Sequence, residues 1–326
     1  MKDVLALLRA HGGRLGAASA LFPHAPRPWL DLSTGVNPRP WTGPRAQDAD
    51  LGRLPDPMAV AALEAAAART FGADPARVAA VAGAEAGLRL VPALTRARSV
   101  AIASPTYGGH AQAWRNAGVE PRETSVAALA DSGAEAVVAV NPNNPDGATC
   151  APADLADGRR WLVVDESFVE VAPELSVAGL RLPRTLVLRS FGKFYGLPGV
   201  RLGFIVAEPS VAARVRALLG DWPVGADAVT MGTAAYLDRN WQAATRRALA
   251  AAADRLDGLL SSAGFAIVGG TSLFRLARAP DAARRFPRLA ERGVLVRPFD
   301  HDDGLLRFGL PPADAWDRLA SALNDL

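Results

Sequence analysis

The sequence predicts an α/β fold, with a large domain built on a mainly parallel sheet and a smaller α+β domain. Short apolar runs alternate with alanine-rich helical stretches through the middle of the chain, which is the rhythm of repeated βαβ units. The apolar runs are continuous, as expected for strands that helices cover on both faces. After Glu208-Pro209 helices and strands become segregated, which indicates a second domain.

The apolar runs place strands of the large domain at 78–81, 100–103, 136–140, 162–164, 186–188 and 204–206, with helices over 59–71, 84–94 and 109–117. In the small domain we expect helices over 211–219, 230–263 and 282–292 and after Pro312, with strand-like segments at 265–268, 273–276, 294–297 and 305–310. The start of the chain is rich in Pro and Gly, and we expect it to form an arm that lies across the surface of a domain. The expected division is therefore 1–44 (arm and part of the small domain), 45–208 (large domain) and 209–326 (small domain).

Length, composition and charge limit the classes of protein to which the chain can belong. The chain has 326 residues, 50% hydrophobic and 21% charged, which is typical of a folded protein in solution. Its 36 basic residues are scattered and nearly balanced by 33 acidic ones, which does not favour nucleic-acid binding. Cys150 is the single cysteine, so we expect no internal disulfide and a reducing compartment. No signal peptide or membrane-spanning run is apparent, and a cytoplasmic location is expected.

The segment 190–203 is the most informative stretch of the chain. It places Lys193 in a glycine-flanked turn, with Ser190 three residues before it and Arg201 eight after it. A lysine that bonds the aldehyde of pyridoxal phosphate must be desolvated, because the neutral amine is the attacking form. A hydroxyl and a guanidinium suit the phosphate of that cofactor, and glycines allow close approach of the backbone. The alternative is a structural lysine in a surface loop.

Two polar motifs follow neighbouring predicted strands. The turn 141–147 comes after strand 136–140 and holds Asn144 between other turn residues, so it is either an amide donor for a phenolate oxygen or a plain turn. Asp165 ends the next strand, where a buried carboxylate needs a partner. A protonated pyridine nitrogen would satisfy it, and a helix-capping aspartate is the alternative.

Two further motifs precede them along the chain. Gly83, Ala84 and Glu85 join a strand to a helix whose first N–H groups could hold a phosphate. Tyr107 follows the next strand and offers an aromatic plate for a flat ring. Each feature is weak alone, but each comes after its own strand, in the order phosphate turn, aromatic plate, Asn, Asp and Ser/Lys/Arg.

This order resembles that of fold-type I pyridoxal-phosphate enzymes, and the chain resembles the class I/II aminotransferase superfamily over essentially its whole length. The resemblance implies pyridoxal 5'-phosphate as cofactor, bonded to Lys193, with Asp165 on its pyridine nitrogen and Asn144 on its phenolic oxygen. It also implies that Tyr107 stacks on the ring.

By the same resemblance, the phosphate is held by four residues: Ser190, Arg201, Ala84 and Glu85, the last two through their backbones. Arg307, in the apolar run 305–310, matches the arginine that binds the substrate carboxylate.

The chain departs from the superfamily pattern at two positions. Phe168 stands three residues after Asp165, where relatives usually have a tyrosine, and this removes a hydroxyl from the phenolic oxygen. Leu54 replaces the tyrosine that reaches a neighbouring subunit's phosphate. Both departures concern details of cofactor binding.

The N-terminal segment narrows the expected activity. Residues 11–14 (His-Gly-Gly-Arg) and 31–38 (Asp-Leu-Ser-Thr-Gly-Val-Asn-Pro) resemble the threonine-phosphate decarboxylases of cobalamin biosynthesis. This implies conversion of L-threonine O-3-phosphate to (R)-1-amino-2-propanol O-2-phosphate and CO₂, with His11, Arg14 and Ser33 as candidates for the substrate phosphate. A surface histidine in a mobile arm is the alternative for His11.

Two other activities stay open at this point. The first is an aminotransferase acting on histidinol phosphate or an aromatic amino acid, which would require 2-oxoglutarate. The second is a pyridoxal-phosphate-binding protein without turnover, against which the intact Lys193, Asp165 and Asn144 argue. The fold places the active site at a subunit boundary, so a two-fold homodimer is expected, with Arg14, Leu54 and the arm contributing across it.

Overall fold

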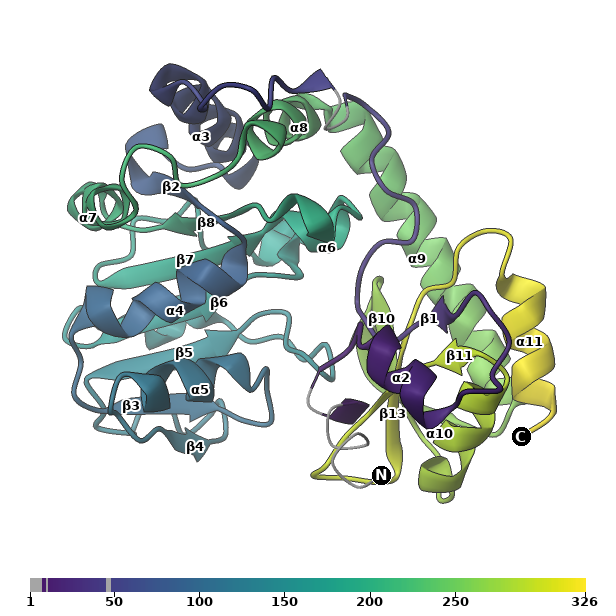
Figure 1. Ribbon diagram of the computed structural model, residues 1–326. Helices are drawn as coiled ribbons and strands as arrows, with labels where there is room; N and C mark the ends of the chain where they lie inside the picture. Colours follow the sequence, from purple (N-terminus) through teal and green to yellow (C-terminus); the bar gives the residue numbers. More distant parts are fainter. Residues whose placement is uncertain (1–7, 10, 45–47) are drawn as a thin grey trace. The chain divides into compact units, whose positions relative to one another are not determined.

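The computed structural model describes residues 8–9, 11–44 and 48–326 and divides them into two compact units (Figure 1). The large unit comprises Pro40–Asn144 and Ala148–Ala243. The small unit comprises the described residues up to Arg39, the short segment Pro145–Gly147, and Ala244–Leu326.

The large unit is organised around one sheet. Among the described residues seven strands form it in the order β2-β8-β7-β6-β5-β3-β4. Their bounds are β2 Val78–Val81, β3 Val100–Ala103, β4 Arg122–Thr124, β5 Ala136–Val140, β6 Trp161–Asp165, β7 Thr185–Ser190 and β8 Gly203–Val206. Strand β8 is antiparallel to both its neighbours, and the remaining pairs are parallel. The predicted α/β fold with a mainly parallel sheet is confirmed.

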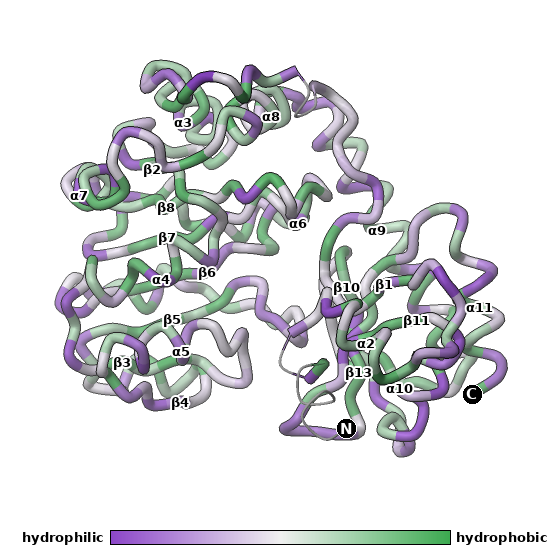
Figure 2. The backbone as a smooth tube through the Cα atoms, in the orientation of Figure 1, coloured by the Kyte–Doolittle hydropathy of each residue, from purple (hydrophilic) through white to green (hydrophobic). Residues whose placement is uncertain are grey.

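Helices cover both faces of this sheet. Contacts with α4 (Ala84–Thr95), α5 (Gly109–Asn116) and α7 (Pro209–Leu219) bury one face, and α3 (Pro57–Phe71) with α8 (Ala226–Leu237) covers the other. Consecutive residues of β8 divide between them, since Ile205 packs in the α4 cluster and Phe204 contacts Phe71 and Tyr236. Hydrophobic residues accordingly follow the strands and the inner sides of the helices (Figure 2).

The small unit contains a four-stranded antiparallel sheet in the order β12-β13-β10-β9 and a parallel pair, β1 with β11, among the residues described. The strand bounds are β1 Leu30–Asp31, β9 Ala266–Thr271, β10 Phe274–Arg278, β11 Val294–Leu295, β12 Arg297–Pro298 and β13 Leu305–Gly309. Its helices are α2 (Leu15–Leu21), α10 (Ala282–Glu291), α11 (Trp316–Asn324) and most of α9 (Arg239–Ser262). The N-terminal arm is therefore built into this unit through β1 and α2.

Three expectations differ from the structure. The single helix expected over 230–263 is two helices that meet at Asp238, whose carboxylate accepts hydrogen bonds from the Trp241 N–H and the Trp41 indole N–H, both at 3.0 Å. The expected domain boundary at 208 and the observed division at 243 differ because α7 and α8 pack on the large unit. The segment 294–297 is divided between β11 and β12, which belong to different sheets.

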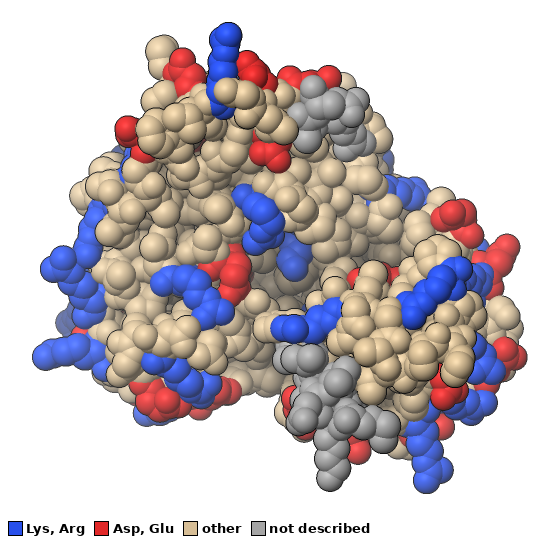
Figure 3. Space-filling model, in the orientation of Figure 1, with Lys and Arg blue, Asp and Glu red and all other residues tan. Residues whose placement is uncertain are grey.

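On the face drawn in Figure 3, basic and acidic side chains are interspersed. Among the described residues, no helix combines the length and the apolar character needed to cross a membrane.

Candidate active site

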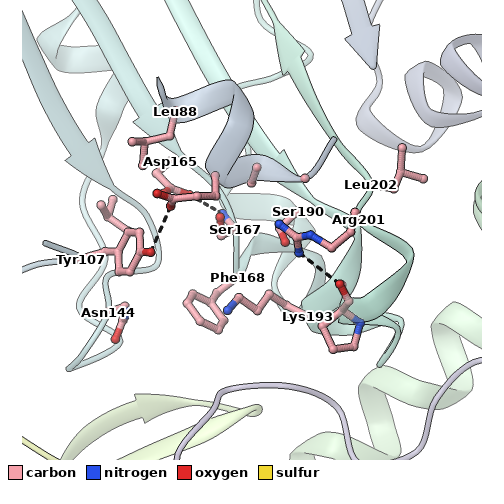
Figure 4. A pocket seen from close by; sticks show the side chains of 16 residues that line it. Leu88, Tyr107, Asn144, Asp165, Ser167, Phe168, Ser190, Lys193, Arg201 and Leu202 are labelled. Atoms are coloured by element: carbon pink, nitrogen blue, oxygen red, sulfur yellow. Dashed lines mark hydrogen bonds between the residues drawn. The ribbon is translucent and has the colours of Figure 1, made fainter. Parts of the chain in front are cut away.

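A cavity of about 170 Å³ lies in the large unit, at the edge of the sheet where the parallel strands end (Figure 4). Because β8 runs against its neighbours, its N-terminal end reaches the same edge and brings Arg201 there. All eight residues predicted to contact the cofactor line this cavity: Ala84, Glu85, Tyr107, Asn144, Asp165, Ser190, Lys193 and Arg201.

At one end of the cavity the first turn of α4 approaches Arg201. A Cβ on Gly83, which has φ of 90°, would lie 2.7 Å from Arg201 Nη2, and one on Gly203 would lie 2.4 Å from the backbone nitrogen of Ala84. The positive φ favours glycine at position 83, and the close backbone of Ala84 requires it at position 203. The N–H groups of the first helical turn, a guanidinium and the nearby Ser190 form a cradle that fits a phosphate group.

Asp165 is buried at the end of β6, with 4% of its surface exposed. His110 Nε2 lies 2.9 Å from its Oδ2, and the Ser167 N–H donates to its Oδ1 at 2.8 Å. Burial alone would raise the pKa of Asp165, but the hydrogen bond and charge of His110, together with Ser167, outweigh burial and lower it. The carboxylate is therefore held ionised, as a partner for a protonated ring nitrogen must be.

Tyr107 is held in place from two sides. Its hydroxyl donates to Glu85 Oε2 at 3.0 Å, and a Cβ on Gly109 would lie 2.4 Å from its ring. Burial and then the Glu85 carboxylate raise the pKa of Tyr107, so the phenol stays neutral. Glu85 also pairs with Arg89 at 2.6 Å, one helical turn along α4. The ring is thus a fixed, uncharged plate at the wall of the cavity.

The loop after β5 separates structural asparagines from the one in the cavity. Asn141 accepts from the Cys150 N–H at 3.1 Å, and Asn143 accepts from the Thr106 hydroxyl at 2.7 Å. Asn144 is the asparagine of this loop that lines the cavity, on the same side as Tyr107 in Figure 4.

Lys193 lies on the short helix α6 (Phe191–Phe194), directly after β7. Its Nζ is 5.4 Å from the centre of the Phe168 ring, and the two side chains lie next to each other in Figure 4. Phe168 is buried, so the position at which relatives have a tyrosine presents an apolar face to the lysine.

The predicted substrate residues lie in the small unit, on β13 and the arm. Arg307 is 7% exposed and donates to the backbone oxygen of Ser33 at 2.8 Å. It pairs in register with Arg297 across β12 and β13. Burial, followed by the charge of Arg297, lowers the pKa of Arg307 to about 9, and Asp31 only partly opposes this. The positive charge of Arg297 on the neighbouring strand therefore acts on the buried guanidinium of Arg307.

The Ser33 hydroxyl, a predicted candidate for the substrate phosphate, is hydrogen-bonded within the arm. It donates to Asp31 Oδ1 at 2.5 Å and accepts from the Gly13 N–H at 2.8 Å, so its proton is already committed within the arm. This interaction brings residues 11–14 next to Ser33. His11 is exposed there, and Arg14 is half-buried at the start of α2.

Sequence reasoning missed His110 and Arg297. His110 stands three residues after Tyr107, one turn along α5, which is a signal that could have placed it near the same cavity. Arg297 lies opposite Arg307 only because of the strand register, which the sequence does not show. Leu54, the second departure from the superfamily pattern, is 66% exposed in the large unit.

The sheet topology and the cavity at its edge define the fold of pyridoxal-phosphate transferases of fold type I, and comparison places the chain within a family. Residues 29–323 match the aminotransferase class I and II family, so the chain belongs to it. It is 39% identical over 324 residues to a threonine-phosphate decarboxylase of Pseudomonas aeruginosa, with 96% of each chain covered. It is 40% identical to a threonine-phosphate decarboxylase of Sinorhizobium sp, with 96% and 97% covered.

More distant likenesses include aminotransferases. Histidinol-phosphate aminotransferase 1 of Burkholderia pseudomallei is 30% identical over 329 residues, with 91% of this chain and 92% of that protein covered. The crystal structure of histidinol-phosphate aminotransferase from Sinorhizobium meliloti, in complex with pyridoxal-5'-phosphate, superposes with a TM-score of 0.81 at 21% identity, covering 95% of this chain and 93% of that one. That structural likeness establishes the fold.

Proposed function

We propose that this chain is a pyridoxal-phosphate-dependent carboxy-lyase that converts L-threonine O-3-phosphate to (R)-1-amino-2-propanol O-2-phosphate and CO₂, a step of cobalamin biosynthesis. The observation that carries this proposal is the identity of about 40% over nearly the full length to two threonine-phosphate decarboxylases, compared with 30% to a histidinol-phosphate aminotransferase. The cavity that holds Lys193, Asp165 and Arg201 supports it.

The cofactor would be held by residues from separate strand ends. Lys193 would bond its aldehyde carbon, Asp165 would accept a hydrogen bond from its ring nitrogen, and Asn144 would donate to its phenolic oxygen. Tyr107 would lie against the ring. The start of α4 at Ala84 and Glu85, together with Ser190 and Arg201, would hold its phosphate.

When bound, pyridoxal phosphate supplies an electron sink that stabilises negative charge at the substrate's Cα. Asp165, kept ionised by His110, would favour a proton on the ring nitrogen and so strengthen this effect. Breaking the bond between Cα and the carboxylate releases CO₂ and leaves the electron pair at Cα, where a proton must be added. We assign this proton to Lys193, which lines the cavity beside Phe168 and would be a free ammonium once the substrate amine had taken its place on the aldehyde carbon.

The substrate is a doubly anionic compound, with a carboxylate and a phosphate, and needs charge-assisted donors. Arg307 is assigned to the carboxylate, with His11 and Arg14 as candidates for the phosphate. The positive charge of Arg297 close to the buried Arg307 supports the binding of an anion in the small unit. Ser33 connects Arg307 to residues 11–14, because its backbone oxygen accepts from Arg307 and its hydroxyl oxygen accepts from the Gly13 N–H. Its hydroxyl proton is donated to Asp31.

The second candidate is histidinol-phosphate aminotransferase activity, which the 30% identity to such an enzyme favours. The two activities differ in their co-substrate. Purified protein should release CO₂ from O-phosphothreonine without any oxo acid. If glutamate forms from histidinol phosphate and 2-oxoglutarate much faster than CO₂ forms from O-phosphothreonine, the decarboxylase assignment is wrong. If neither reaction occurs although the cofactor is bound, the protein is a binding protein without turnover.

We also propose that the protein is a cytoplasmic homodimer. Three large apolar side chains at the start of α3 and in the segment before it are strongly exposed, namely Leu51 at 69%, Leu54 at 66% and Met58 at 81%. A second copy that covers this patch would remove it from water. Light scattering should give twice the mass of the 34.0 kDa chain, and a fully active monomer at micromolar concentration would contradict the proposal.

A further inference from the structure

The three residues that follow Asn144 in the chain pack with the small unit rather than with the large one. Asn144 belongs to the large unit, but the next residues, Pro145–Gly147, pack with the small unit before the chain returns at Ala148. The Asn143 N–H donates to the Ala148 backbone oxygen at 2.8 Å and so closes the base of the loop. We call Pro145–Gly147 the tab.

The tab lies against two glycines of β9, backbone on backbone. A Cβ on Gly147, which has φ of 72°, would lie 2.0 Å from the backbone oxygen of Gly270. A Cβ on Gly269 would lie 2.2 Å from the backbone oxygen of Asp146. Real Cβ atoms do not approach this closely, so the absence of side chains on both surfaces is what permits the contact.

Gly269 is the informative position because its own backbone does not require glycine. Its φ lies outside the left-handed region, unlike Gly147 at 72° and Gly270 at 144°. The three nearest heavy atoms to an added Cβ all belong to Asp146. Glycine weakens a strand relative to alanine, so an ordinary strand would tolerate or gain from a methyl group at this position. The tab is therefore the feature that a side chain there would displace.

We propose that Gly269 and Gly270 are positioning residues for Asn144: by seating Asp146 and Gly147 on β9, they fix the amide at the cavity wall. The inference rests on the proposed function, in which Asn144 donates a hydrogen bond to the phenolic oxygen of pyridoxal phosphate. Its consequence is that a methyl group on β9, far along the chain from every predicted cofactor residue, changes the electronic state of the bound cofactor.

The test compares Gly269→Ala with Asn144→Ala and with a matched control, Gly258→Ala, in the loaded protein. An added Cβ at Gly258, on α9, would meet no atom within 4 Å. The readouts are the absorbance of the cofactor as a function of pH and the dissociation constant of pyridoxal phosphate. Losing the amide donor disfavours the ionised phenolic oxygen, so Asn144→Ala should raise the apparent pKa of the chromophore. Gly269→Ala should shift it in the same direction and weaken cofactor binding about tenfold, as expected for a hydrogen bond to a charged oxygen.

The outcomes separate this inference from the proposed function. If the native protein forms no chromophore with pyridoxal phosphate, the proposed function fails. If the native chromophore forms but Gly269→Ala titrates like Gly258→Ala, the positioning role is wrong and the cofactor assignment stands. If Asn144→Ala leaves the titration unchanged, the inference is also overturned.

Circular dichroism would detect a loss of folding in Gly269→Ala, and a second variant tests the inference in that case. One glycine inserted after Asn144 leaves the β9 surface intact but loosens its tie to the amide. This variant should show the same shift of the chromophore as Asn144→Ala, and an unchanged titration would overturn the inference.

Discussion

The cavity of the large unit and the arginine pair of the small unit balance their charges in opposite ways. In the cavity, Asp165 and Tyr107 each have a partner from another part of the chain: Asp165 has His110, and Tyr107 has Glu85. In the small unit, Arg307 faces a second arginine, Arg297, in strand register, and donates to a backbone oxygen.

The difference shows what each region is suited to bind. The ionised Asp165 and the neutral Tyr107 are fixed before any ligand arrives, which is the preorganisation that a tightly held cofactor needs. Arg307 carries an electrostatic penalty from burial and from Arg297, which an arriving anion would relieve. The predictions below test this contrast between the cofactor cavity and the arginine pair, from the largest expected effect to the smallest.

Replacing Lys193 should have the largest effect. Lys193→Ala removes the amine assigned both to the cofactor aldehyde and to proton delivery, so turnover should fall by at least about 10⁴-fold. The chain has two lysines, Lys2 and Lys193, so borohydride reduction of the yellow native protein should label the peptide containing Lys193. Circular dichroism of the colourless variant should match that of the native protein. Undiminished activity would end the pyridoxal-phosphate proposal.

Removing the charge of Arg307 should separate activity from stability. Arg307→Met keeps most of the side-chain volume, and the loss of a charged donor to a buried anion should lower kcat/KM by roughly 2–5 kcal/mol in free-energy terms. The unfolding temperature of the ligand-free variant should change little, because Met removes both the cost of burying the charge and the hydrogen bond to the backbone oxygen of Ser33. Cofactor absorbance should not change.

The control for Arg307→Met is Arg278→Ala, on the neighbouring strand β10, whose guanidinium is about half exposed and paired with Asp302 at 2.7 Å. It should leave kcat/KM nearly unchanged, since exposed ion pairs contribute little. Equal losses in the two variants would show that the arginine pair is not specially placed for the substrate.

Removing His110 should unbalance the cavity. In the native protein the pKa of Asp165 is lowered, so the stability it contributes is present above its usual pKa and is lost as the pH falls through the folded-state value. In His110→Phe the effect of burial remains and raises that pKa, so the loss should begin at higher pH. Cofactor affinity measured between about pH 4 and 8 should fall earlier than in the native protein, by about tenfold at the acid end. His110→Gln, which keeps a donor, should recover part of it, and superimposable pH profiles would refute the pairing.

Much of the fold follows from local sequence because the strands are covered on both faces. The runs 78–81, 100–103 and 136–140 coincide with β2, β3 and β5, all of whose residues are buried. The break between α8 and α9 was not predicted, because the alanine-rich pattern continues across it. It depends on Asp238, which contacts Trp41 from a distant part of the chain.

The candidate site likewise contains residues that the local sequence predicts and residues that depend on contacts between distant parts of the chain. Lys193, Asp165 and Asn144 were predicted because each follows its own strand, and parallel strands end at one edge of a sheet. His110 was missed because its contact with Asp165, 55 residues further along the chain, forms only in the folded protein. The hydrogen bond from the Ser33 hydroxyl to Asp31 joins residues two positions apart. It is a local side-chain turn that the sequence could have predicted.

Phe168→Tyr should give the smallest effect, and its sign should depend on the cofactor. Phe168 is 3% exposed, so a hydroxyl added there would be buried and would lower stability unless it found a partner. In the ligand-free protein we expect the unfolding temperature of the variant to fall. With pyridoxal phosphate bound, the phenolic oxygen becomes an acceptor near that hydroxyl, as the usual tyrosine of relatives implies, and the loss should shrink or reverse by about 1 kcal/mol. The measurement is the unfolding temperature of native protein and variant, each with and without cofactor. An equal shift in both states would show that the side chain at position 168 does not face the phenolic oxygen. Asn144 would then be the remaining residue assigned to donate a hydrogen bond to that oxygen.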